Sequence, residues 1–235
     1  MTTFSLDKLR CTPAYPFSEA AHYLDLPTST LRAWCLGQRY RAEGKEKWFR
    51  PVIALDGRQG EGLSFLNLVE AHVLAAIRRV HGIPLPKVRS ALEFVSKQLG
   101  IARPLARAEF QTNGLDLFVE ELGRLVNVTS EGQIEIRAMI QAHLRRIERD
   151  SSGLPIKLFP FTRTATAQDA PAPVEVDPRV AFGRPVLAGR AVPTAVLADR
   201  VKAGDTLADL ARDFGVGPEQ IEEAIRCELD RRAAA

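Results

Sequence analysis

The chain has 235 residues, of which 46% are hydrophobic and 26% charged, and its formal net charge is +3. These values are typical of a globular protein that forms one large or two smaller domains. No apolar run approaches the roughly 20 residues of a membrane-spanning helix, and the N-terminal residues lack the apolar core of a signal peptide, so we predict a cytoplasmic protein without membrane contact.

The first predicted element is a pair of short helices joined by a tight turn, in residues 18–34 (SEAAHYLDLPTSTLRAW). Ser18 can cap the first helix, and Thr28 or Ser29 can cap the second. Apolar residues at helical spacing give each helix an inward face. This pattern predicts a helix-turn-helix, although many packed helix pairs never contact DNA.

A basic segment follows in residues 38–55 (QRYRAEGKEKWFRPVIAL). It alternates around a Glu-Gly-Lys turn, which predicts a hairpin that closes on Trp48, Phe49 and Val52. Between positions 29 and 50, six basic and two acidic residues leave a local charge of +4. Because a helix can enter the major groove while a basic hairpin neutralises flanking phosphates, the charge favours DNA binding over packing alone.

Two longer helices are predicted next, one from Ser64 and one from Pro86 to about Leu99. The helix pair, the hairpin and these two helices, in this order, resemble a MerR-type winged helix-turn-helix domain over residues 15–99. In that family the helix pair and the wing contact DNA, and the next two helices support them. The resemblance implies DNA contacts from Ser29, Thr30, Arg32, Arg39, Tyr40, Arg41, Lys45, Lys47 and Arg50.

The pattern changes in residues 109–136, where Asn113-Gly114 and Glu131-Gly132 are each flanked by alternating residues. We therefore predict two β hairpins as an added structural layer, closed by a helix over about 137–149. A Thr-, Ala- and Pro-rich stretch then predicts a semi-stiff linker. The predicted organisation is a domain of residues 1–161, a linker of residues 162–176 and a small domain of residues 177–235.

The small domain contains a second pattern of two helices and a turn, in residues 206–225. Two basic and six acidic residues between positions 206 and 229 leave a local charge of −4. Since like charge beside phosphate is repulsive, this element is expected to face protein and not DNA. The predicted fold class is thus mainly α with small β hairpins: a MerR-like winged helix-turn-helix domain plus a small α+β domain with a second helix-turn-helix.

Residues 177–228 resemble a small domain that begins with a Gly-x-Pro-x-Ile-x-Gly strand signature and commonly occurs in antitoxins encoded beside PIN-like ribonuclease toxins. The signature residues here are Gly183, Pro185, Leu187, Gly189, Val192 and Pro193. A MerR-like head joined to this tail resembles a VapB-type antitoxin of a type II toxin–antitoxin system. The resemblance implies two partners, operator DNA for autorepression and a PIN-like ribonuclease toxin.

Two segments are candidates for toxin contact, because a carboxylate-rich nuclease site attracts basic or extended segments. The first lies in residues 153–163 and either packs on the N-terminal domain or docks the toxin as a flexible strip. The second is the strand signature, whose arginines are either solvated edge residues or toxin contacts. The candidate residues are Ile156, Lys157, Leu158, Phe159, Phe161, Arg163, Arg184 and Arg190.

We also expect a homodimer formed mainly through the small domain, because about 60 residues cover apolar side chains poorly and a dimer supplies paired half-sites. The apolar residues concerned are Val186, Leu187, Val192, Val196, Leu197 and Val201. Two rival functions remain open. One is a MerR-like transcription regulator without a toxin partner, and the other is an adaptor that joins proteins without binding DNA.

Catalysis and metal binding are not expected. The three cysteines are odd in number and widely separated, and no pair has the spacing of zinc ligands. The sequence has neither a Ser/His/Asp grouping nor a Gly-rich phosphate loop. We therefore predict no enzyme activity, no cofactor and no metal site.

Overall fold

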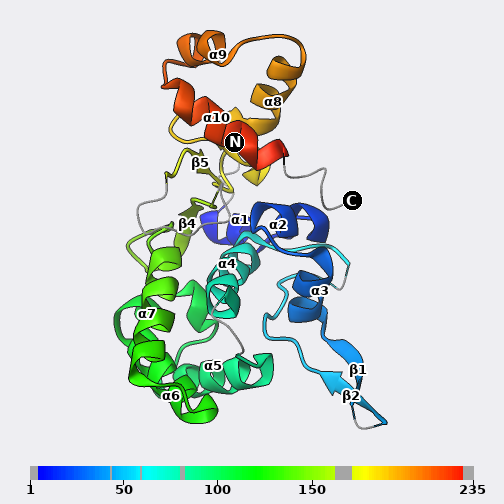
Figure 1. Cartoon of the computed structure of the whole chain (residues 1–235), viewed down its shortest axis with the longest axis vertical. Coiled ribbons are helices and arrows are strands. Elements are labelled where there is room, and N and C mark those ends of the chain that lie inside the picture. The colour runs from blue at the N-terminus through cyan, green and yellow to red at the C-terminus, as the bar shows by residue number, and fades with distance from the viewer. Residues whose placement is uncertain (1–4, 43, 59, 80–82, 162–170, 230–235) are drawn as a thin grey trace.

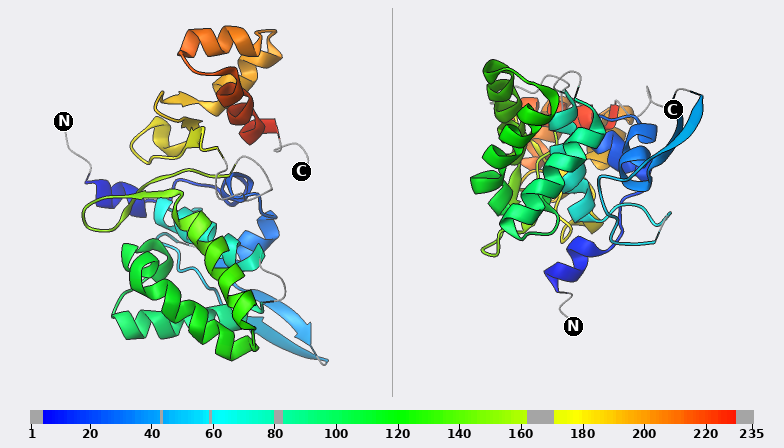
Figure 2. Two further views of the ribbon diagram at one scale, coloured as in Figure 1. Left: turned by 60° about the vertical axis from the view of Figure 1, so that its left-hand side comes forward. Right: turned by 90° about the horizontal axis from the view of Figure 1, so that it is seen from below.

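The computed structural model describes residues 5–42, 44–58, 60–79, 83–161 and 171–229. An N-terminal region forms one end of the molecule and a C-terminal module forms the other, as Figure 1 shows. Both views in Figure 2 show a β hairpin that projects away from the body of the N-terminal region. No described helix is long and apolar enough to cross a membrane.

The N-terminal region is largely helical, with two small two-stranded antiparallel sheets. Its helices are α1 (Leu6–Cys11), α2 (Phe17–Tyr23), α3 (Thr28–Leu36), α4 (Phe65–Arg79), α5 (Leu85–Leu99), α6 (Leu115–Val126) and α7 (Ser130–Leu144). Its strands are β1 (Gln38–Ala42), β2 (Lys45–Phe49), β3 (Ile147–Arg149) and β4 (Pro155–Leu158).

Helix α4 is the centre of the N-terminal core. Its sequence is apolar on almost every face, and Phe65, Leu68, Val73 and Ile77 are fully buried. Ser64 caps it, because its Oγ accepts a hydrogen bond from the backbone N–H of Asn67 at 3.1 Å. A helix that is apolar all round must be surrounded, and α1, α7 and the turn after α5 pack on it.

The predicted hairpin at Asn113-Gly114 is wrong. Phe110–Gly114 form a π-helical turn that continues directly into α6. Phe110 and Phe118 are fully buried. A Cβ on Gly114 would lie 3.2 Å from both Phe110 and Val95. The glycine therefore permits a close approach between helices, and does not form a turn.

The second predicted hairpin, at Glu131-Gly132, is also wrong, because these residues lie in the first turn of α7. Asn127 ends α6 in a left-handed conformation (φ 53°), and Thr129 caps α7 by accepting a hydrogen bond from the Gly132 N–H at 3.2 Å. The turn-forming residues thus separate two helices and not two strands. The helix predicted over 137–149 begins earlier and gives way to β3 after Leu144.

The C-terminal module has a three-stranded antiparallel sheet in the order β5-β6-β7, a 3-10 turn (η3) and three helices. The elements are β5 (Val174–Glu175), η3 (Ala181–Gly183), β6 (Val186–Leu187), β7 (Val192–Pro193), α8 (Thr194–Lys202), α9 (Leu207–Phe214) and α10 (Pro218–Leu229). Strand β5 lies inside the predicted linker of residues 162–176, so the folded module begins earlier than predicted. Residues 162–170 lie outside the described residues.

The reason given for a homodimer does not hold for the side chains on which it rested. Val186, Leu187 and Leu197 are at most 1% exposed within the single chain, and the sheet and α10 cover them. Val196, on α8, is 44% exposed. The small module therefore buries most of its own apolar residues, and dimerisation needs another argument.

Candidate nucleic-acid interface

Helices α2 and α3 pack as the predicted pair. Leu31, Trp34 and Cys35 of α3 are at most 5% exposed, which places the opposite side of the helix in solvent. Each helix begins directly after a proline, which is itself the N-cap residue, so none of Ser18, Thr28 and Ser29 is the N-cap residue. A proline that precedes the first turn stops the chain from continuing the helix backwards, and here it replaces the predicted side-chain caps.

The residues predicted to reach DNA from α3 lie on its outer side. Ser29 and Arg32 are exposed, and Thr30 is half-buried. The guanidinium of Arg32 lies over the ring of Phe17, 5.2 Å from its centroid. This cation–π contact gives the Arg32 side chain a defined direction before any ligand binds.

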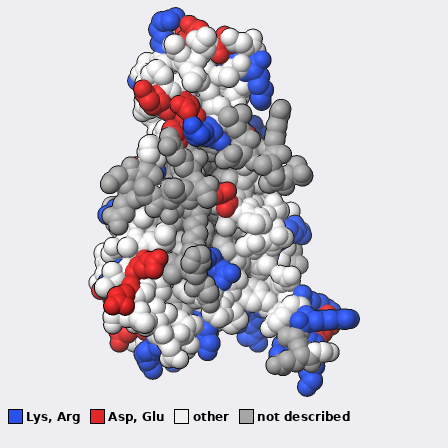
Figure 3. Space-filling view, in the orientation of Figure 1, with Lys and Arg blue, Asp and Glu red and all other residues white. Residues whose placement is uncertain are grey.

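Strands β1 and β2 form the predicted basic hairpin, and its register divides the charged side chains between two faces. Arg39 is paired with Trp48 and Arg41 with Glu46 on one face. Tyr40 is paired with Lys47 on the other face, which also carries Lys45. Figure 3 shows that lysine and arginine gather on this projecting hairpin. The exposed basic residues of the hairpin and its base are Arg39, Arg41, Lys45, Lys47 and Arg50.

Trp48 was expected to close the hairpin on the core, and this expectation is wrong. Its side chain is 54% exposed, and it shares a surface hollow with Arg39 and Glu46. One edge of its ring covers Gly37, where a Cβ would lie 2.6 Å from both the Trp48 ring and the Phe49 carbonyl oxygen. The ring therefore lies between the end of α3 and the hairpin, on the solvent side.

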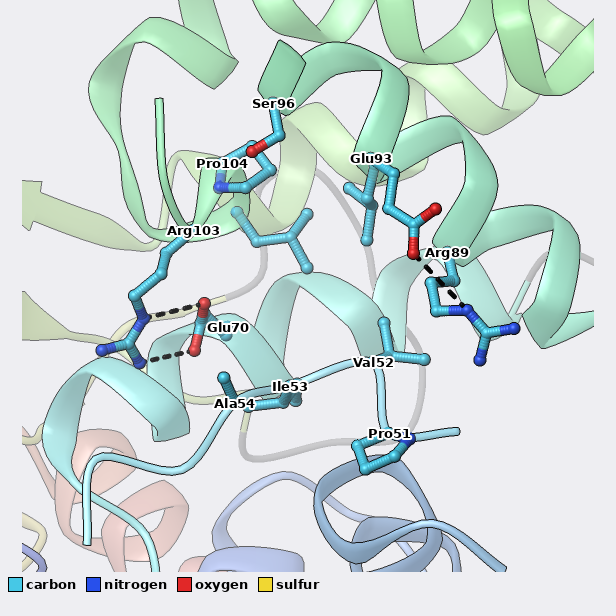
Figure 4. A pocket seen from close by; sticks show the side chains of 12 residues that line it. Pro51, Val52, Ile53, Ala54, Glu70, Arg89, Glu93, Ser96, Arg103 and Pro104 are labelled. Carbon is cyan, nitrogen blue, oxygen red and sulfur yellow. Dashed lines mark hydrogen bonds and ion pairs between the residues drawn. The ribbon is translucent and has the colours of Figure 1, made fainter. Parts of the chain in front are cut away.

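The base of the hairpin is attached to α5 through Arg89. Its Nη1 donates a hydrogen bond to the Arg50 carbonyl oxygen at 2.9 Å, and its guanidinium lies 5.8 Å from the centroid of the Phe49 ring. Glu93 on the next turn of α5 forms an ion pair with Arg89 at 3.7 Å. Figure 4 shows this pair beside a pocket of about 220 Å³ under the segment that follows the hairpin. Helix α5 thus supports the hairpin, as predicted for the supporting helices.

A second arginine closes the opposite side of that pocket (Figure 4). Arg103 donates two hydrogen bonds to Glu70, at 3.1 and 2.7 Å, and a third to Asp56 at 2.6 Å. Burial raises the pKa of Glu70 above its usual value, although Arg103 and Asn67 act in the opposite direction. This network ties α4 and the segment after α5 to Asp56, in the segment between the hairpin and α4.

The C-terminal helix pair has a different character. Thr206 and Asp209 form a reciprocal capping box on α9, and Gly215 ends that helix in a left-handed conformation. Arg200, Arg212 and Arg226 are all paired with carboxylates of the module. Residues 206–229 thus carry a net charge of −4, and their two arginines are already paired with carboxylates. This surface does not favour phosphate binding.

The structure places the first toxin-contact candidate, residues 153–161, in the folded body. Strand β4 pairs with β3, and Leu158 is fully buried and exchanges backbone hydrogen bonds with Val176. The expectation of a flexible strip is wrong for the described part of this segment, because its alternating apolar residues complete the core. Ile156, Lys157 and Phe159 are half-buried. Lys157 pairs with Glu175 at 3.1 Å. Arg163 lies outside the described residues.

Phe161 lies against the same body. Its ring is 4.8 Å from the ring of His143, and the guanidinium of Arg146 lies 4.3 Å from its centroid.

The arginines of the second toxin-contact candidate, the strand signature, lie on the surface of the C-terminal module. Arg184 and Arg190 are both exposed, and Arg190 donates a hydrogen bond to the Gly215 carbonyl oxygen at 2.8 Å. The described candidates of residues 153–161 therefore pack in the folded N-terminal region, whereas Arg184 and Arg190 are exposed on the C-terminal module.

Metal ligation has no support in the described part of the chain. No group of three or more His, Cys, Asp or Glu side chains there could hold an ion. The three cysteines are free thiols, and burial raises the pKa of Cys35 to about 12. The residues that do converge are cations and aromatic rings on the hairpin, which are suited to contacts with phosphates and bases.

Known proteins resemble the chain over most of its length. Residues 13–92 match the family "Putative DNA-binding HTH domain", and residues 174–226 match the family "Protein of unknown function (DUF433)". The "Putative antitoxin VapB45" of Mycobacterium tuberculosis (strain ATCC 25618 / H37Rv) is 30% identical over 229 residues, covering 91% of this chain and 92% of that protein. The chain belongs to the family of this antitoxin.

Two further proteins of M. tuberculosis support the same whole-chain likeness. The "Uncharacterized protein Rv2308" is 26% identical over 230 residues, covering 90% of this chain and 88% of its own length. The crystal structure of Rv2018 superimposes with a TM-score of 0.68 at 27% identity, covering 91% of this chain and 97% of that chain. The fold described above is thus shared with a solved structure over nearly its full length.

Some surface features escaped prediction from the sequence. The exposure of Trp48 depends on the positions of Gly37 and α3 in the fold, and the residues around Trp48 in the sequence do not predict it. Phe182, which is 94% exposed, directly precedes the strand signature, and nothing in the sequence distinguishes it from a buried apolar residue. The positive φ of Phe182 (57°) likewise cannot be predicted from the sequence.

Proposed function

We propose that this chain is the antitoxin of a type II toxin–antitoxin system, which binds operator DNA to repress its own gene and neutralises a PIN-like ribonuclease. The observation that carries the proposal is the 30% identity to an antitoxin over 91% of the chain. The helix-turn-helix domain with its exposed basic hairpin supports the DNA-binding half of the function.

The DNA contacts follow from the geometry of a winged helix-turn-helix. Helix α3 presents Ser29, Thr30 and Arg32 to the major groove, and the hairpin follows the adjacent phosphates as a wing. Arg39, Arg41, Lys45, Lys47 and Arg50 supply the positive charge, and Tyr40 completes the wing surface. In this proposal the two faces of the hairpin reach the two sides of one groove.

The protein-binding half of the function belongs to the C-terminal module. Its helices carry paired or acidic side chains, which do not suit phosphate, and its sequence matches a different family from that of the DNA-binding domain. We further propose that two copies of the chain bind one operator, because helix-turn-helix domains commonly read paired half-sites. The chain itself acts by binding and not by catalysis.

The test combines two measurements on the purified full chain. The first is a gel shift on the promoter region of its own gene over a range of salt concentrations. The second is capture of a PIN-domain ribonuclease encoded beside it, with an assay of RNA cleavage. Salt-dependent DNA binding together with capture and inhibition supports the proposal. DNA binding without capture favours the MerR-like regulator, and capture without DNA binding favours the adaptor.

A further inference from the structure

The turn between β5 and β6 presents the most exposed large hydrophobic side chain of the described residues. Phe182 is 94% exposed, compared with 66% for Ile134 and 54% for Trp48. An aromatic ring gains free energy when it leaves water, and folded proteins usually bury most of it. A single exposed apolar side chain is common on protein surfaces, so the backbone, the charge and the hollow around Phe182 decide whether it marks a binding surface.

Three successive residues at Phe182 have a left-handed backbone conformation. Ala181, Phe182 and Gly183 have successive φ angles of +47°, +57° and +77°, and residues with side chains rarely adopt such values. Gly183 lies so close to Tyr15 that a Cβ would be 2.3 Å from the tyrosine Oη. The Arg184 N–H donates to the Ala181 carbonyl oxygen at 3.1 Å and closes the turn. The turn that carries the exposed ring is therefore held in a conformation that is unfavourable for Ala181 and Phe182.

Two residues after Phe182 lies Arg184, a charged side chain that has no partner among the described residues. Of the Lys and Arg side chains in residues 171–229, five form ion pairs inside the module: Arg179, Arg200, Lys202, Arg212 and Arg226. Arg190 donates to a carbonyl oxygen. The side chain of Arg184 is exposed and has no hydrogen bond or ion pair within the described residues. Arg184 therefore offers a guanidinium that is unpaired within the described residues, two positions from the exposed ring of Phe182.

A surface hollow of about 270 Å³ completes this patch. Phe182, Gly183 and Arg184 line it from the C-terminal module, and the segment around Tyr15 and Glu19 lines it from the N-terminal region. The Tyr15 hydroxyl is buried and has no hydrogen-bond partner within the described residues. A hollow of this size accommodates a side chain inserted by another protein, beside an anchor that projects from this one.

We propose that Phe182 and Arg184 form the docking surface for the ribonuclease partner, with Phe182 filling an apolar pocket of the nuclease and Arg184 pairing with a carboxylate at its rim. Carboxylates are the groups that a metal-dependent nuclease gathers around its site, so the charges are complementary. The basic hairpin lies at the end of the molecule opposite the C-terminal module that carries Phe182 and Arg184 (Figure 1), and the carboxylate of Glu19 lines the hollow, so DNA phosphate is an unsuitable occupant. This inference rests on the proposed function and specifies the partner-binding surface.

The test measures the affinity between the purified full chain and the PIN-domain ribonuclease encoded beside it. Phe182→Asn removes the ring but keeps the turn, because asparagine tolerates positive φ. Arg184→Glu reverses the free charge. Each is expected to weaken binding by roughly 30-fold, the change typical of a truncated interface anchor.

The matched controls are Phe182→Tyr, which keeps the aromatic ring, Ile134→Asn, which removes another exposed apolar side chain, and Arg212→Glu, which reverses a paired arginine of the same module. They are expected to stay within about twofold of the unmodified chain. Unchanged DNA affinity in every variant shows that the chain remains folded.

Each contrary outcome has a distinct meaning. If the unmodified chain binds the nuclease and both Phe182→Asn and Arg184→Glu bind it equally well, this inference is wrong and the proposed function stands. If the unmodified chain does not bind the nuclease, both are wrong. If Phe182→Asn instead lowers self-association in sedimentation with unchanged nuclease affinity, the surface joins two copies of this chain and the inference is overturned.

Discussion

The imidazole Nε2 of His22 in α2 is hydrogen-bonded to the carbonyl oxygen of Cys227 in α10, although 205 positions separate the two residues. A second contact lies nearby, where Gly183 packs against the Tyr15 hydroxyl. The first contact joins α2 to α10, and the second joins the segment before α2 to η3 of the C-terminal module. The module is therefore docked on the helix-turn-helix domain and not merely tethered to it.

Replacing His22 with Phe is expected to lower the free energy of unfolding by about 1 kcal/mol, because one hydrogen bond between the two regions is lost while the ring-sized volume is kept. Chemical denaturation monitored by circular dichroism measures this change. Ser18→Ala, an exposed position on the same helix, is the control and is expected to have almost no effect. Equal stability of both variants would contradict the importance of this contact.

Gly37→Ala is expected to destabilise the chain by about 2–3 kcal/mol and to weaken DNA binding. Gly37 has φ +76° and ψ 175°, a region that is essentially restricted to glycine, and an added Cβ would clash with the Phe49 carbonyl oxygen and the Trp48 ring. Gly44→Ala is the control. It also has a positive φ, of +74°, but a Cβ there meets nothing within 4 Å, so the cost is expected to be about 1 kcal/mol. Thermal unfolding and gel shifts distinguish the two.

Simultaneous replacement of Arg39, Arg41 and Lys47 by Ala is expected to weaken binding to all DNA sequences. The slope of log affinity against log salt concentration should become shallower by roughly 0.9 for each phosphate contact that is lost. Replacement of Lys202, Arg212 and Arg226 by Ala removes the same charge from the C-terminal module, and should leave the slope unchanged. Identical slopes in the two triple variants would rule out the hairpin as the phosphate-binding surface.

Arg32→Ala is expected to act differently from the hairpin variants. Arg32 projects from the outer side of α3, and a single arginine on a base edge contributes about 1–3 kcal/mol of discrimination. The variant should therefore lose preference for the operator over unrelated DNA, with little change in salt dependence. Competition gel shifts with operator and scrambled duplexes measure this ratio. A retained ratio with uniformly weaker binding would make Arg32 a phosphate contact.

The ion pair between Arg10 and Asp150 predicts a dependence of stability on pH. Partial burial acts to raise the pKa of Asp150, but hydrogen bonds from Ser152, from the Leu154 amide and from Arg10 outweigh it and lower the pKa from 3.8 to about 2. A carboxyl group with a lowered folded pKa stabilises the fold fully above its ordinary pKa. This stabilisation is lost as the pH falls from about 4 to 2.

Asp150→Asn is the variant that tests this dependence. At neutral pH it should unfold about 2 kcal/mol more easily, because the buried Arg10 loses its nearest counter-charge. It should also lose part of the stability change between pH 4 and pH 2. Denaturation curves at a series of pH values measure both effects. Parallel pH profiles for the variant and the unmodified chain would show that Asp150 does not titrate in this way.

Local signals in the sequence were sufficient for the DNA-binding end of the molecule. The helix pair, the hairpin, α4 and α5 all follow from apolar spacing, prolines and the cap at Ser64, and the structure has each of them. The charge contrast between the two helix pairs also follows from composition alone. These features depend on neighbours within a few residues of each other, so the printed order of residues contains the necessary information.

Packing between distant segments decided the rest. Asn113-Gly114 fits a turn or a close helix contact equally well, and the burial of Phe110 and Phe118 against α5 selects the helix. The exposure of Trp48 and of Phe182 likewise depends on what the fold leaves beside them.

The sequence by itself determined the helix pair, the hairpin, α4 and α5, and which end carries positive charge, whereas α1 was not predicted. Only the tertiary structure decided which side chains are buried, because burial depends on contacts between residues far apart in the chain.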